Sequence, residues 1–199
     1  MKYCLARCSR YRFRFQSSTA SAYGNISHIH QCGQLLERTQ APTAPDNIEL
    51  YLRHLLFCAS ATEFEQDTYE LYPPQPRKLA ALSRPDAQAQ LALWLDYYQL
   101  GQYRPLPFFP KTSLSAARYW YKRRQKANTP AEYGSEERSA AFKMYMDSHN
   151  GKPQAEYPEV AQVFGRDDTL PIDSPLFWQL IEELLLPMMA TLKTAEKEQ

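Results

Sequence analysis

The sequence predicts an α+β fold, with a small sheet near the start of the chain and a mostly helical second half. Arginine and aromatic residues alternate strictly over residues 10–15, and this two-residue period is typical of a strand covered on one face. Later in the chain, apolar residues recur every three to four residues, which is the spacing of helices that bury one stripe. Strands early and helices thereafter favour the α+β class.

The first part of the chain is expected to hold two strands and one short helix. The strand over residues 10–15 would turn its aromatic residues toward a core and expose Arg10, Arg12 and Arg14. Residues 17–26 are small and polar and predict a loop, residues 28–38 predict a short helix, and residues 68–72 predict a second strand. Because the first strand begins so close to the start, we expect the chain to be a fragment of a longer protein.

Helices account for most of the remaining chain. Each predicted helix begins at a capping residue or beside a proline, and these positions are Asp46, Ser83, Thr112 or Ser113, Ser135, Tyr157 and Ser174. The second of these helices should end at Gly101 and the third near Ala127. Pro187 should kink or end the last helix, because proline lacks the N–H that an interior turn needs.

We expect one domain over residues 1–199. Its sheet-plus-helix core would occupy residues 1–127, and a helical appendage over residues 135–195 would pack on that core. The boundary between these two parts would fall in the polar stretch 128–134.

Composition excludes several classes of protein. Hydrophobic residues make up 44% and aromatic residues 13% of the 199 residues, which is enough to build a core and argues against a disordered chain. No apolar run approaches the ~20 residues of a membrane span, and the start lacks the apolar segment of a secretory signal. The four cysteines, at positions 4, 8, 32 and 58, do not resemble a disulfide framework, which indicates the cytoplasm.

Charge is unevenly distributed although the net charge is only +1. Residues 1–36 carry five basic residues and no acid, and residues 97–131 carry seven basic residues and no acid. Residues 37–96 have a net charge of −4 and residues 132–199 a net charge of −7. Such blocks indicate a surface that suits a polyanion or a protein partner, unless folding intermixes the blocks and the surface averages out.

A nuclease of the restriction-endonuclease type needs an acid-x-Lys triplet on one strand, because this spacing places both side chains on the same face beside a divalent metal. In this chain the residues two positions before the lysines are Pro76, Phe109, Trp120, Arg124, Ala141, Asn150, Thr191 and Ala195. None is acidic, and Lys2 has no such neighbour. The triplet is therefore absent.

Other catalytic or metal-binding constellations are weak, and we expect neither a metal nor a cofactor. Ligand types for zinc occur at Cys4, Cys8, His28, His30 and Cys32. On a strand, however, Cys4 and Cys8 would lie about 13 Å apart, too far to share one ion.

Cys58 and His54 lie one helical turn apart, which could activate a thiolate. On such an apolar helix they are better read as a core thiol and a hydrogen-bonded histidine. The chain has no glycine-rich phosphate loop of either common type.

A basic face on the helix before residue 127 is the leading candidate for DNA contact. Arg118, Lys122 and Lys126 recur every four residues, with Arg123 and Arg124 beside them. Such a face can neutralise phosphates, and Tyr119 could stack on a base or a sugar. The alternative is a solvated surface, or one paired with the acidic blocks. Arg12 and Arg14 on the first strand form a second candidate DNA-binding face.

Three stretches resemble the C-terminal part of the gamma subunit of exodeoxyribonuclease V, the RecC family. Residues 47–59, NIELYLRHLLFCA, resemble a helix with the pattern WLxHLxxCA. Residues 105–116, PLPFFPKTSLSA, are similar to a PLPFxPK segment before a helix, and residues 177–189, FWQLIEELLLPMM, to the closing helix. Order and spacing agree over about residues 45–190. The chain departs from the family at residues 38–46, where members often carry a basic turn, and this weakens the expectation of DNA contact at that edge.

The resemblance implies a restriction-endonuclease-like fold that has lost its active site. It also implies a non-catalytic part of the RecBCD helicase–nuclease complex, which docks the RecD-type helicase subunit, assembles with the RecB-type subunit and helps guide DNA strands in double-strand-break repair. One alternative is an active metal-dependent nuclease with a rearranged site drawn from Glu63, Glu65, Asp67 and Glu70. Convergence of these acids with a lysine would discriminate it. Another alternative is a stand-alone nucleic-acid-binding domain.

Overall fold

The computed structural model describes residues 9–16, 21–30, 32–60, 67–72, 76–127, 132–147, 152–165 and 169–197. The chain divides into two compact units, one formed by Met1–Gln99 with Thr191–Gln199 and the other by Leu100–Ala190. The division of the chain into residues 1–127 and 135–195 stays a prediction about its domains.

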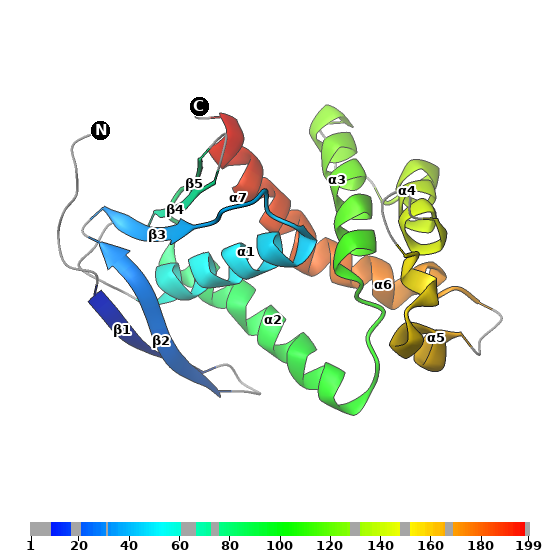
Figure 1. The fold of residues 1–199 in the computed structure, drawn as a ribbon, viewed down its shortest axis with the longest axis horizontal. Helices are drawn as coiled ribbons and strands as arrows, with labels where there is room; N and C mark the ends of the chain where they lie inside the picture. Colours follow the sequence, from blue (N-terminus) through cyan, green and yellow to red (C-terminus); the bar gives the residue numbers. More distant parts are fainter. Residues whose placement is uncertain are drawn as a thin grey trace. The chain divides into compact units, whose positions relative to one another are not determined.

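The first unit contains a five-stranded mixed sheet with the strand order β1-β2-β3-β4-β5 (Figure 1). The strands are β1 (Ser9–Gln16), β2 (Ser21–His30), β3 (Gly33–Glu37), β4 (Thr68–Leu71) and β5 (Arg77–Leu79). Only β3 and β4 pair in parallel, and the other three pairs are antiparallel. The parallel pair requires a crossover, which α1 (Ala44–Ala59) provides. The predicted α+β class with a small mixed sheet is confirmed.

The prediction for the segment between the first strand and α1 is wrong. Residues 21–26, expected in a loop, belong to β2, and residues 28–38, expected to be a short helix, form the end of β2 and all of β3. The cause is a β-bulge: the register shifts between Ser9 and Tyr11 on β1, and His28 on β2 has a φ of 61°. An extra residue disrupts the two-residue alternation that reveals a strand, so Ile26 and Ile29 both face the core although three positions apart.

The core of the first unit forms where this sheet packs against α1. Ile26, Ile29 and Phe57 are buried together, and Phe13 packs against them. On β1, Phe13 and Phe15 are half-buried whereas Arg12 and Arg14 are exposed, so the predicted alternation of this strand is confirmed where its side chains are described.

Three helix starts differ from prediction. Gly134, and not Ser135, is the N-cap of α4 (Ser135–Met146). Thr43, and not Asp46, is the N-cap of α1, and the Asp46 carboxylate accepts a hydrogen bond from the Thr43 N–H at 2.8 Å. Asp46 is therefore the third helical residue of a capping box. The helix α3 (Pro110–Ala127) begins two residues before Thr112, because Pro110 fits the first turn and the Ser113 hydroxyl accepts from the Phe109 N–H (3.1 Å).

The helix α2 (Arg84–Tyr103) begins directly after Ser83, whose hydroxyl accepts from the Asp86 N–H at 3.2 Å. This start is confirmed, but α2 continues two residues past Gly101.

The second unit is helical. It contains α3 and α4 (Ser135–Met146), the short turns η1 (Gln154–Glu156) and η2 (Pro171–Asp173), and the helices α5 (Pro158–Phe164) and α6 (Pro175–Leu180), followed by the turn η3 (Ile181–Leu185). Trp120 of α3 and Trp178 of α6 are both buried and meet edge to face, and Tyr133 stacks on Trp178 with ring centroids 4.1 Å apart.

Pro187 does not end the last helix. The chain continues from η3 into α7 (Leu186–Lys197), and η3 is a wider π-helical turn that ends two residues before Pro187. A proline cannot donate to the carbonyl four residues earlier, and widening the preceding turn accommodates that loss. In the described part of the chain, no helix combines the length and the apolar character needed to cross a membrane.

Candidate nucleic-acid interface

The five basic residues predicted on α3 lie on two different sides of the helix. Arg118, Lys122 and Lys126 are exposed, whereas Arg123 and Arg124 are half-buried. Residues four apart on a helix lie on the same face, so the three exposed cations follow one line along α3. No carboxylate of the described residues lies within ion-pair distance of these three.

Arg123 and Arg124 are held by acids of the second unit. Arg123 Nε lies 2.9 Å from Oε1 of Glu137, which is fully buried on α4, and Glu137 also accepts from the Gly134 N–H at 2.7 Å. Arg124 pairs with Glu182 at 2.5 Å and lies over the Trp120 ring, 4.7 Å from its centroid. These two arginines therefore stabilise the packing of α3, and their charges are already compensated within the protein.

A further cation of this face was missed from the sequence. Lys111 is exposed and lies seven residues before Arg118, which places it on the same side of α3. It was missed because the helix was expected to begin only at Thr112 or Ser113. The helix dipole disfavours a cation in the first turn, so helix stability does not account for a lysine here. We call Lys111, Arg118, Lys122 and Lys126 the basic row.

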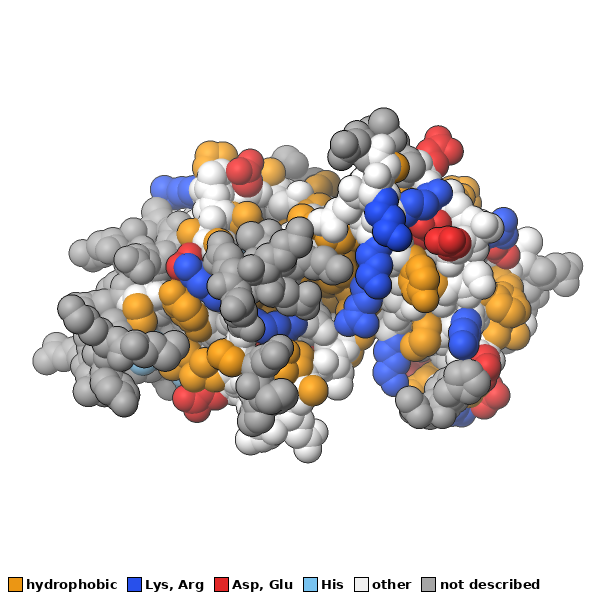
Figure 2. Space-filling model, turned by 90° about the horizontal axis from the view of Figure 1, so that it is seen from above, with side chains coloured by type: hydrophobic (Ala, Val, Ile, Leu, Met, Phe, Trp, Pro, Cys, Tyr) orange, Lys and Arg blue, Asp and Glu red, His pale blue; other side chains and the backbone are white. Residues whose placement is uncertain are grey.

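A groove runs between α3 and α4. One hollow of about 590 Å³ is lined by Tyr119, Lys122, Arg123, Lys126, Ser135, Glu136 and Glu137. A second of about 570 Å³ shares Tyr119, Ser135 and Glu136 with the first and extends along α4 to Ser139 and Lys143. Figure 2 shows basic side chains gathered in a column on this part of the surface, with acidic side chains next to them.

The second predicted face, on β1, is also exposed. The register pairs Arg12 with Asn25 and Arg14 with Tyr23, so these four side chains share the outer face of the β1–β2 hairpin. Tyr23 is 80% exposed. Tyr23 and Asn25 were missed because residues 17–26 were taken for a loop.

The two acids of the alternative nuclease site that the structure describes, Asp67 and Glu70, do not lie on one face. Asp67 does meet a lysine, Lys78, at 2.9 Å, but the Asp67 carboxylate also accepts from the Ala81 N–H at 2.9 Å. Asp67 directly precedes β4 and Glu70 lies within it, three residues on, so their side chains point to opposite faces of the sheet. Glu63 and Glu65 lie outside the described residues.

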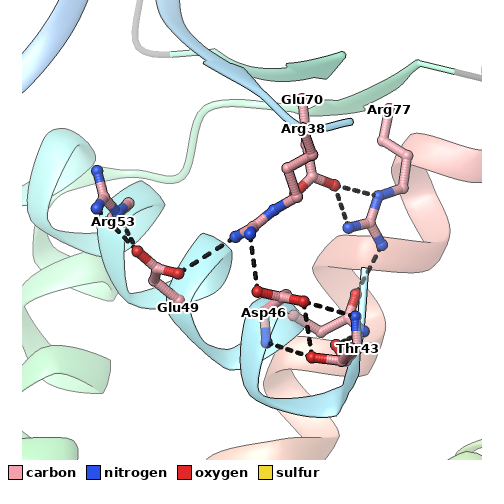
Figure 3. A network of polar contacts seen from close by, with 8 residues as sticks. Arg38, Thr43, Asp46, Glu49, Arg53, Glu70 and Arg77 are labelled. Carbon is pink, nitrogen blue, oxygen red and sulfur yellow. Dashed lines mark hydrogen bonds and ion pairs between the residues drawn. The ribbon is translucent and has the colours of Figure 1, made fainter. Parts of the chain in front are cut away.

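Glu70 is fully buried, and its carboxylate forms ion pairs with two arginines (Figure 3). Arg38 donates from Nε to one carboxylate oxygen at 2.6 Å, and Arg77 donates from Nε to the other at 2.9 Å. Arg38 also reaches Asp46 and Glu49 on α1, and Arg77 donates to Asn47 at 2.8 Å. This network ties β4 and β5 to the start of α1, which makes Glu70 a structural carboxylate.

His54 and Cys58 have the character of core residues, as predicted. Burial lowers the pKa of His54 to about 4, against an opposing hydrogen bond with the Ala80 backbone, and His54 Nδ1 lies 2.9 Å from the Thr68 hydroxyl. Burial raises the pKa of the Cys58 thiol to about 11. A neutral histidine and a protonated thiol do not form an activated nucleophile.

A zinc site receives no support from the described residues, among which no three His, Cys, Asp or Glu side chains are grouped so that they could hold a metal ion. Cys4 and Cys8 lie outside the described residues, and Cys32 is half-buried.

Comparison with known proteins adds one finding to this geometry. No curated protein matches the chain. Residues 6–132, which are more than half of the chain and include the sheet, α1 and α3 with its basic row, match a family described as the RecC C-terminal domain. The protein therefore belongs to the RecC C-terminal domain family.

Proposed function

We propose that this chain is a non-catalytic module that docks a RecD-type helicase subunit, assembles with a RecB-type subunit and guides a DNA strand along α3. Membership of the RecC C-terminal domain family implies a role in the RecBCD complex. The observation that carries the DNA part is the basic row, four exposed cations on one helix face with no acidic partner among the described residues. Cations in this state are available to neutralise phosphates.

The proposal includes a nuclease-like core without an active site. Two features support it: the mixed strand order β1-β2-β3-β4-β5 with α1 crossing between β3 and β4, and the missing acid-x-Lys triplet. The buried ion pairs of Glu70 with Arg38 and Arg77 support it further, because they use the only acid within β4 for structure.

The test is a reconstituted complex that contains this chain, a RecB-type subunit and a RecD-type subunit. A variant with Arg118→Ala, Lys122→Ala and Lys126→Ala should co-elute with both partners as the unchanged chain does, but unwind linear duplex more slowly. The deficit should be largest at low salt and shrink as salt rises, because the unchanged chain loses more affinity to salt than the variant does. A matched variant changes three exposed cations that are not part of the basic row, Arg84, Arg104 and Lys152, and should unwind normally.

Two outcomes would contradict the proposal. If the unchanged chain fails to co-elute with the partner subunits, the docking part is wrong. If the two triple variants unwind equally well, the basic row does not guide DNA.

The alternative of an active nuclease has one observation in its favour, the contact between Asp67 and Lys78. The opposite facing of Asp67 and Glu70 argues against it.

A further inference from the structure

The basic row forms a straight track on the second unit. Its four cations span sixteen residues of α3 from Lys111 to Lys126, or fifteen steps along the helix, which is about 22 Å at the rise of an α-helix. Between Arg118, Lys122 and Lys126 the step is four residues, or about 6 Å. This step is close to the separation of neighbouring phosphates on an extended nucleic-acid strand, so successive cations can each meet a successive phosphate.

The two walls of the α3–α4 groove differ in chemistry. In the hollow that Lys122 and Lys126 line on α3, the α4 wall carries the exposed carboxylate of Glu136 and the hydroxyl of Ser135. The second hollow adds Ser139 and one cation of α4, Lys143. A carboxylate repels phosphates, but it accepts hydrogen bonds from the N–H groups of unpaired bases, which are amino groups in cytosine and adenine and N3–H in thymine. A strand in this groove therefore has a preferred orientation, with its backbone along α3 and its bases toward α4.

Tyr119 lies at the middle of the groove, in the part that both hollows share. It is 50% exposed, and it follows Arg118 directly, so an aromatic ring lies beside the phosphate track. Aromatic side chains stack on unpaired bases whatever their identity. In a duplex the bases stack on one another and their faces are inaccessible to such a ring.

We propose that the α3–α4 groove binds a single DNA strand, with its phosphates on the basic row and one base stacked on Tyr119. This inference rests on the proposed function and deepens it by naming the form of DNA that α3 guides. An acidic protein segment could also pair with the basic row. It is disfavoured because Glu136 on the opposite wall would repel it and because it would make no use of Tyr119.

The test uses the full chain and a fluorescein-labelled oligothymidylate of about 12 nucleotides, within the range that single-strand sites cover. Three further probes are an abasic strand of the same length, a blunt duplex and a polyglutamate peptide. Binding is measured by fluorescence anisotropy over a salt series. The chain should bind oligothymidylate more tightly than each of the other three.

The informative variants are Tyr119→Ala and Tyr119→Phe. Tyr119→Ala should weaken oligothymidylate binding about tenfold, the loss of one base–aromatic stack, and should leave abasic-strand binding unchanged. Tyr119→Phe keeps the ring and should bind as the unchanged chain does. Because Tyr119 is half exposed, both variants should keep the original unfolding midpoint, which excludes misfolding as a cause.

The basic row is tested by its salt dependence. Each change of Lys111, Arg118, Lys122 or Lys126 to Ala should make the slope of log K against log salt shallower by about 0.7, the value for one phosphate on a single strand. Arg84→Ala, an exposed cation of the first unit, should leave the slope unchanged.

Several results would overturn the inference: duplex bound as tightly as the single strand, no effect of Tyr119→Ala, or polyglutamate bound as tightly as oligothymidylate. Failure of this inference differs from failure of the proposed function. A chain that co-elutes with its partner subunits but shows no Tyr119-dependent binding keeps the docking role and loses the strand site. A chain that binds the strand through Tyr119 but does not co-elute keeps the strand site alone.

Discussion

At the scale of single residues, the Glu70 carboxylate balances the charges of two arginines in the first unit. It is fully buried, and both of its oxygens accept from arginines, Arg38 and Arg77. Replacing it with a neutral residue leaves the buried Arg77 without a carboxylate partner among the described residues, whereas Arg38 keeps Asp46 and Glu49. We expect Glu70→Gln to lower the free energy of unfolding by about 3 kcal/mol or more, measured by urea denaturation.

A matched control is Arg53→Gln. Arg53 pairs with Glu49 at 2.8 Å one helical turn away, but both side chains are more than 40% exposed. Exposed pairs of this kind contribute about 0.5 kcal/mol or less. Similar losses in the two variants would contradict the structural role of Glu70.

His54 should make stability depend on pH. Burial lowers its pKa in the folded protein to about 4, so between pH 6.5 and 4 the unfolded chain binds a proton that the folded chain does not. Unfolding should therefore become easier as pH falls, by up to about 1.4 kcal/mol per pH unit, and the effect should be absent above pH 7. Urea midpoints measured from pH 7 to 5 test this.

The range stops at pH 5 so that a second group does not contribute. Hydrogen bonds from Thr43 lower the pKa of Asp46, and stability from that carboxylate is lost only as pH falls below its ordinary value near 4. His54→Gln should flatten the pH dependence between pH 7 and 5, whereas His28→Ala, at an exposed position, should keep it. An unchanged slope in His54→Gln would show that another group is responsible.

At the scale of elements, the connection from β2 to β3 depends on Gly33. Its φ is +123°, a conformation that side chains rarely adopt, and a Cβ here would collide with the backbone carbonyl oxygen of Asp67. Since this carbonyl accepts from the Gln34 N–H at 2.9 Å, the collision would also disturb the pairing of β3 with the start of β4. We expect Gly33→Ala to lower the free energy of unfolding by about 2 kcal/mol, measured by thermal or urea unfolding.

The same substitution at Gly101 should not lower the free energy of unfolding. This glycine lies inside α2, and a Cβ there would make ordinary contacts with Leu106 at 3.4 to 3.8 Å. Alanine has the higher helix propensity, so Gly101→Ala should be neutral or stabilising by up to about 1 kcal/mol. If both alanine variants were equally destabilised, the left-handed conformation of Gly33 would not be the cause.

The elements also explain where sequence reasoning succeeds. β1 was found because its arginines and aromatics alternate without interruption, and the start of α2 because Ser83 caps it locally. β2 was missed because the bulge at His28 interrupts the same alternation. The start of α3 was missed because Thr112 and Ser113, residues typical of caps, are instead buried inside the helix.

At the scale of the whole molecule, we expect no nuclease activity. The chain should not cleave linear duplex or single-stranded DNA with magnesium or manganese, because the acid-x-Lys triplet is absent and Glu70 is held in ion pairs. Release of labelled nucleotides measures this. Metal-dependent cleavage that disappears with Asp67→Asn, but not with Asp86→Asn at an exposed position, would establish the alternative site.

Folding intermixes the charge blocks in part. Arg123 and Arg124, from the block with seven basic residues, pair with Glu137 and Glu182 of the last acidic block, whereas the basic row does not pair with described acids. The side of α3 with Arg123 and Arg124 therefore has its charge balanced by acids of the protein, whereas the side with the basic row remains a surface that suits a polyanion.

The sequence by itself determined the α+β class, the family and the absence of the catalytic triplet, because periodicity, motifs and spacing are local properties that need no partner. Only the tertiary structure decided which cations of α3 are available, since Glu137 and Glu182 lie 14 and 58 residues away from the arginines that they hold. It also decided that Asp67 and Glu70 face apart and that Lys111 joins the basic row. The electrostatic energy of a charge depends on its distance in space to other charges, and the sequence contains no local signal for a partner that is far away in the chain.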